Sequence, residues 1–89
     1  ILFMNINKLI SIVKKKLEVN FKIDHIKIED KSFIHKNHAE NQKEKFHLKI
    51  KINSKELNNL SRLESNKRIY KVLDDELKKY IHSIQILIS

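Results

Sequence analysis

Eighty-nine residues with 40% hydrophobic content are enough for one small globular domain, and the absence of cysteine excludes a disulfide or a thiolate metal site within the chain. The formal net charge of +8 rests on 17 lysines and only two arginines, which favours lysines scattered over solvated faces above a selected nucleic-acid surface. No apolar run approaches the ~18 residues of a membrane span. We expect a cytoplasmic protein with a single domain over residues 1–89, in which Met4 is a candidate natural start and residues 1–3 are an extension.

The first half of the chain predicts a helix followed by two strands. Apolar residues recur at helical spacing and predict a helix over residues 6–18, which Asn5 or Asn7 caps. Apolar and polar residues then alternate and predict strands over residues 23–29 and 47–53. We expect these strands to form an antiparallel hairpin with a long polar loop.

The second half predicts a short helical turn, a long helix and a last strand. Ser61 and Glu64 have the spacing of a capping box and start a helix over residues 61–79. Alternating isoleucines predict a strand over residues 84–88. His82 is expected at the joint between helix and strand. The acidic run of Asp74, Asp75 and Glu76 is expected on a solvated face of the helix.

The predicted element order is α-β-β-(short helix)-α-β, an α+β fold in which helices cover one face of a three-stranded sheet. The sequence contains no glycine and no proline, so turns fall to residues that tolerate left-handed backbone, and we expect Asn37 and Asn59 in such turns. The missing glycines also exclude a Gly-rich phosphate loop. No nucleophile or acid–base arrangement stands out, and we do not expect an enzyme.

Histidines carry the remaining candidate chemistry. His25 is expected to be structural or exposed, and His47, which alternates outward on the second strand, is expected to be a surface residue. His35 and His38 are three positions apart in the polar loop, where two imidazoles can share a metal or simply form a polar surface. His82 taken alone is a helix-end residue stabilised by the helix dipole.

An ordered set of motifs resembles the BolA family along about 60 residues. Asp30, Ser32, the loop histidines His35 and His38, and His47-Leu48-Lys49 follow one part of the family pattern. Ser61 through Tyr70 and then Ile81-His82-Ser83-Ile84 follow the other part. The chain departs from the pattern where Ser65-Asn66-Lys67 replaces Arg-His-Arg, which weakens any DNA contact made there.

The resemblance implies a class II KH-like fold and a monothiol glutaredoxin as partner. It implies a 2Fe-2S cluster shared with the glutaredoxin and glutathione, with His82 as one ligand and His35 or His38 as the other. We expect no cofactor in the isolated chain, which should be a monomer or a weak dimer. Imidazole ligands raise the reduction potential of such a cluster, which suits sensing or transfer in iron–sulfur trafficking.

A DNA-binding transcriptional regulator is the alternative function. The net charge and the family's helix-turn-helix-like segment favour it. Lys67, Arg68 and Lys71 begin a basic cluster on the long helix, but the acidic run that follows interrupts this cluster. We therefore expect any DNA binding to be weak and strongly salt-dependent.

Overall fold

A computed structural model describes residues 4–32 and 45–89 of the chain. The elements in chain order are α1 (Ile6–Asn20), β1 (His25–Asp30), β2 (Phe46–Asn53), α2 (Lys55–Asn58), α3 (Arg62–Val72), α4 (Asp74–Lys79) and β3 (Ile81–Ile88). His35 and His38, Asn37, which was expected in a turn, and residues 1–3 lie outside the described residues. Within the part described, no helix is both long and apolar enough to cross a membrane.

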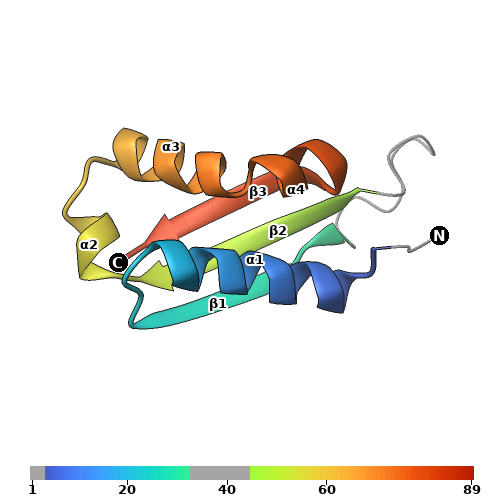
Figure 1. Ribbon diagram of the computed structural model, residues 1–89, viewed down its shortest axis with the longest axis horizontal. Helices are drawn as coiled ribbons and strands as arrows, with labels where there is room; N and C mark the ends of the chain where they lie inside the picture. Colours follow the sequence, from blue (N-terminus) through green and yellow to red (C-terminus); the bar gives the residue numbers. More distant parts are fainter. Residues whose placement is uncertain (1–3, 33–44) are drawn as a thin grey trace.

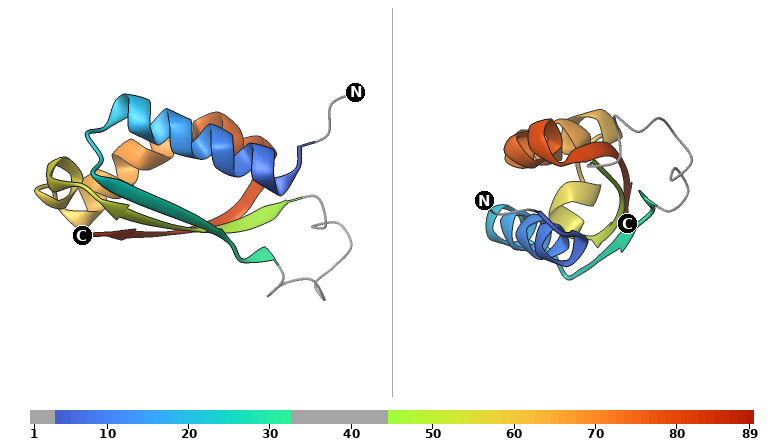
Figure 2. Two further views of the ribbon diagram at one scale, coloured as in Figure 1. Left: turned by 90° about the horizontal axis from the view of Figure 1, so that it is seen from below. Right: turned by 90° about the vertical axis from the view of Figure 1, so that its right-hand side faces the viewer.

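The three strands form one mixed sheet with β2 in the centre. β1 pairs with β2 antiparallel, as predicted for the hairpin, and β3 pairs with β2 parallel. The helices lie together on one face of this sheet, whereas no described helix covers the other face (Figures 1 and 2). The predicted α+β layer is therefore confirmed.

The core lies between the sheet and the helices. Leu9, Val13 and Leu17 recur along α1 and are fully buried in the same hydrophobic cluster as Ile50 and Ile52 of β2. Among the described residues, the buried apolar side chains are Leu9, Val13, Leu17, Phe21, Ile26, Leu48, Ile50, Ile52, Leu57, Ile69, Leu73 and Ile81. The helical spacing of α1 and the alternation of β2, both predicted from the sequence, therefore place their apolar side chains in one core.

Side-chain oxygens cap three of the helices. The amide oxygen of Asn5 accepts a hydrogen bond from the Lys8 N–H at 2.8 Å and starts α1. The hydroxyl of Ser61 accepts from the Glu64 N–H at 3.0 Å, which confirms the Ser61 half of the predicted capping box. Ser54 caps α2 in the same way.

Three details of the second half differ from the prediction. The single helix expected over 61–79 is two helices, because Leu73 has ψ of 17° and separates α3 from α4 without a glycine or proline to mark the break. The last strand begins at Ile81 rather than at residue 84. Asn59 has right-handed backbone (φ −77°), and none of the described residues has a positive φ.

The acidic run is also not uniformly solvated. Asp74 and Asp75 are exposed, but Glu76 is buried, and its carboxylate lies 2.8 Å from the Lys16 ammonium group on α1. The hydrogen bond from Lys16 to Glu76 raises the pKa of the lysine above its ordinary value. The pair joins α1 to α4, the helix that leads into β3.

Candidate functional site

His82 lies on an irregularity in the sheet at the start of β3. Phe46 is paired with Ile81, and His47 is paired with Ser83, so His82 is the extra residue of a β-bulge. The end of α4 is fixed to β2 at the same place, because the Tyr80 carbonyl accepts a 2.8 Å hydrogen bond from the Phe46 N–H. Ile81 is buried while His82 is exposed. The histidine therefore belongs to the strand, not to a joint before it, and the bulge sets the position of its ring.

His47 lies in a more buried environment than the sequence predicted. It was expected on the surface, but it is only 6% exposed. Its Nδ1 lies 2.6 Å from the Ser83 hydroxyl, and its ring meets the His82 ring edge-on, with centroids 4.9 Å apart and planes at 68°. The prediction failed because strand alternation shows which face a residue occupies, not which neighbours cover that face. Two imidazoles thus lie side by side at one end of the sheet.

The Asp-x-Ser motif holds this end of the sheet together. The Asp30 carboxylate accepts a hydrogen bond from the Ser32 N–H at 2.9 Å, which turns the chain after β1. The Ser32 hydroxyl accepts from the His47 N–H at 3.1 Å, and the His47 carbonyl accepts from the Lys31 N–H at 2.7 Å. Ser32, the last described residue before the segment with His35 and His38, is therefore bonded directly to the candidate site.

The described residues provide part of a ligand set. No group of three or more His, Cys, Asp or Glu side chains gathers anywhere in residues 4–32 and 45–89. His82 is exposed and has the buried His47 beside it, so this end of the sheet can offer the His82 imidazole to a metal centre that another molecule also ligates. It fits a co-ligand role in a shared 2Fe-2S cluster and does not make a complete four-ligand site.

The predicted basic cluster is exposed on α3. Lys67 and Lys71 are four residues apart, so they lie on the same side of the helix. Arg68 is paired with Glu64, whose carboxylate lies 3.0 Å from Nε of the arginine. This pair holds the pKa of Glu64 below its ordinary value and offsets the charge of Arg68. The cluster therefore carries less net charge than the sequence indicated.

The uncovered face of the sheet carries a second group of lysines, which the sequence analysis did not single out. Lys27 and Lys51 are cross-strand partners, and Lys49 is opposite Glu29. Glu29 lies 3.3 Å from the Lys31 ammonium and 3.5 Å from that of Lys51, and these cations hold the pKa of the carboxyl below its ordinary value. The register of the predicted hairpin could have identified this group of lysines from the sequence.

The structure defines a small α+β domain with a histidine pair at one end of a mixed sheet. A family model described as BolA-like protein matches residues 17–89, and the chain belongs to this family. The BolA domain of SufE1 from Arabidopsis thaliana is 28% identical, with a TM-score of 0.75 over 89% of this chain and 87% of that chain. BolA1 from the same plant is 25% identical, with a TM-score of 0.75 over 90% and 88%.

A curated relative carries a functional name. The chain is 29% identical over 75 residues to the DNA-binding transcriptional regulator BolA of Haemophilus influenzae, which covers 84% of this chain and 70% of that protein. The family resemblance stated from the motifs is thereby confirmed. The class II KH-like label stays a prediction.

Proposed function

We propose that this protein is a BolA-like adaptor that binds a monothiol glutaredoxin and contributes histidine ligands to a bridging 2Fe-2S cluster, in iron–sulfur trafficking or iron and redox regulation. The observation that carries the proposal is the exposed His82 on the β-bulge, with the His47 ring beside it. A bulge at this point gives an imidazole a defined direction, which a ligand shared between two proteins needs.

The contacts around His82 support the proposal, because they hold its ring in place. Ser83 engages the His47 ring, and this ring limits the rotation of the His82 ring. We assign His47 as a positioning residue on these contacts. His35 or His38 supplies the second imidazole, and that part of the proposal rests on the family resemblance alone.

The absence of cysteine fits a cluster that is shared with a partner rather than one that this chain holds alone. Thiolates provide most iron–sulfur ligation, and this chain has none, so the thiolates must come from the partner and from glutathione. When bound, such a cluster supplies one-electron redox chemistry or is itself the cargo that is handed on. This chain would hold imidazoles against one iron and cover that side from solvent.

The test is addition of the purified chain to a monothiol glutaredoxin loaded with cluster and glutathione, followed by size-exclusion chromatography with visible detection. We expect one heterodimer peak that carries both proteins and the cluster absorbance. The double variant His35→Ala/His38→Ala should lose the cluster from this peak, whereas either single variant should only weaken it. Elution of the two proteins apart, with the cluster on the glutaredoxin alone, would reject the proposal.

A DNA-binding regulator is the second candidate, favoured by the assignment of the Haemophilus relative as a DNA-binding transcriptional regulator and by the exposed lysines of α3. Its test is a mobility-shift titration at low and physiological salt with specific and scrambled duplexes. Tight, sequence-selective binding at physiological salt would place this function ahead of the first. Weak binding that disappears with salt is what the composition predicts.

A further inference from the structure

β3 is an edge strand whose outer backbone groups have no partner among the described residues. Ser89 bonds toward β2, since its N–H donates to the Ile52 carbonyl at 2.9 Å and its carbonyl accepts from the Ser54 N–H at 3.0 Å. Peptide groups alternate in direction along a strand, so the N–H and C=O groups of Ile84, Ile86 and Ile88 point away from the sheet. These three residues present a strand edge ready for pairing.

The two edges of the sheet are protected differently. β1 carries Lys27, Glu29 and Asp30, and charges of this kind discourage pairing with another strand. β3 spans eight residues, Ile81–Ile88, without a Lys, Arg, Asp or Glu and without a proline. An edge of this length without a charged side chain or a proline is a template on which another strand can pair.

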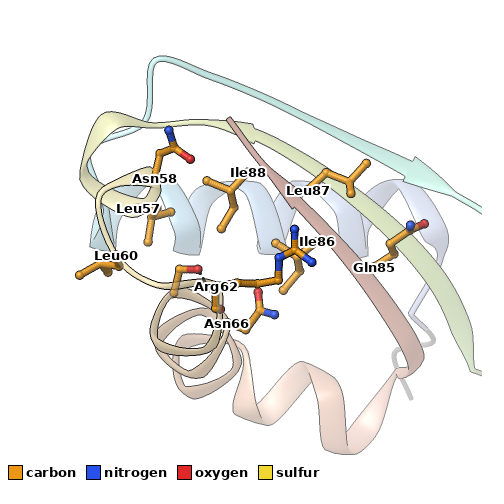
Figure 3. A pocket seen from close by; sticks show the side chains of 10 residues that line it. Leu57, Asn58, Leu60, Arg62, Asn66, Gln85, Ile86, Leu87 and Ile88 are labelled. Atoms are coloured by element: carbon orange, nitrogen blue, oxygen red, sulfur yellow. Dashed lines mark hydrogen bonds between the residues drawn. The ribbon is translucent and has the colours of Figure 1, made fainter.

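A groove runs along this edge between the start of α3 and the C-terminal half of β3 (Figure 3). Its volume is about 480 Å³. Arg62 and Asn66 reach into it from α3 toward β3. The rest of the lining is mixed, because the apolar Leu57 of α2, Leu60 of the turn before α3, and Ile86, Leu87 and Ile88 of β3 lie beside the polar Asn58, Ser65 and Gln85.

We propose that this edge and groove bind an extended peptide segment of a partner protein by strand addition to β3. The peptide's backbone would pair with Ile84, Ile86 and Ile88, and every second side chain would enter the groove. Aliphatic side chains suit the leucines and isoleucines of its lining, and one carboxylate suits Arg62, whose guanidinium group can bond both carboxylate oxygens. The ligand is therefore an aliphatic segment with one acidic residue on its groove side.

Two other occupants fit less well. A second copy of this chain would bring another charge of +8 and another basic α3 to the same edge, which opposes self-pairing. Single-stranded nucleic acid is held by aromatic platforms under its bases or by a glycine-rich clamp on its backbone. Among the described residues no aromatic side chain lines this groove, and the chain contains no glycine. The lining therefore favours the acidic–aliphatic peptide.

The probes are two fluorescein-labelled synthetic peptides that alternate valine and threonine over the length of β3, one with a glutamate and the other with a glutamine in place of one valine. Anisotropy titrations should show that the glutamate peptide binds about tenfold more tightly, the scale expected of one charge-assisted pair. Arg62→Gln should abolish this difference. Lys55→Gln is the matched control, because Lys55 is exposed and lies outside the groove, and it should keep the difference.

Amide hydrogen exchange locates the binding. Peptide binding should protect the amides of Ile84, Ile86 and Ile88 and leave those of β1 unchanged. Ile86→Pro removes an outward N–H without removing a bond to β2, and it should lower affinity for both peptides. If this variant does not fold, the Arg62→Gln comparison decides alone. Equal affinity of both peptides for the wild-type chain, or protection elsewhere, overturns the proposal. So does protection of this edge by self-association or by an oligonucleotide in place of the peptides.

Discussion

Replacing Lys16 by methionine removes the ion pair that joins α1 to α4, while it keeps a side chain of similar length. The Glu76 side chain is 9% exposed and that of Lys16 is 37% exposed, so the substitution leaves a nearly buried carboxylate without its cation. Loss of one partner costs about 3–5 kcal/mol for a fully buried pair and about 0–1 kcal/mol for an exposed one.

Water reaches the lysine and screens the ion pair, so the expected loss of stability lies well below the value for a fully buried pair. We expect the free energy of unfolding to fall by about 1.5 kcal/mol, or roughly 6–12 °C in Tm for a domain of this size. Urea denaturation followed by far-ultraviolet circular dichroism measures the change. Lys15→Met is the control, because Lys15 is an exposed neighbour on the same helix.

The pH dependence of this difference has a definite sign. The folded-state pKa of Lys16 is raised above the ordinary 10.5, chiefly by the hydrogen bond to Glu76. The contribution of Lys16 is therefore fully present below pH 10.5 and is lost as pH rises through the raised value. A Lys16→Met variant that is as stable as Lys15→Met at neutral pH would refute the reasoning.

Three further predictions concern stability and DNA. Ser61→Ala should lower the free energy of unfolding by about 1 kcal/mol because it removes the N-cap of α3, whereas Ser11→Ala, at an exposed position inside α1 that caps nothing, should not lower it in the same urea titration. Ile50→Ala in the central strand should cost about 2–5 kcal/mol by thermal denaturation, and a cost near zero would contradict its full burial. Reversing the charges of Lys67 and Lys71 should weaken duplex binding equally for all sequences and make it less salt-dependent, and a sequence-selective loss in filter binding would count against this view.

Much of the fold could be predicted because its signals are local. The helical and strand periodicities depend only on which side chains are apolar. They predict burial of Leu9, Val13 and Leu17 in α1 and of Ile50 and Ile52 in β2, and the structure buries all five. The Ser61 cap is equally local, because its partner lies three residues away.

What the sequence could not predict depends on contacts between distant residues or on single dihedral angles. Glu76 looked solvated because its partner, Lys16, is 60 positions away in the chain. The break at Leu73 comes from one backbone angle that no residue type marks. The meeting of His47 and His82 requires both the parallel pairing of β2 with β3 and the bulge, neither of which leaves a pattern in the residues.

The measurement that tests the central claim most directly is the visible circular dichroism of the reconstituted glutaredoxin complex with single-histidine variants. His82→Ala should abolish the Rieske-like spectrum, because it removes the imidazole that the bulge directs outward. His25→Ala, an equally exposed histidine at the start of β1, should leave the spectrum unchanged. His47→Ala should alter the spectrum without abolishing it, because His47 positions His82 and does not replace it. A wild-type spectrum for His82→Ala would contradict the account.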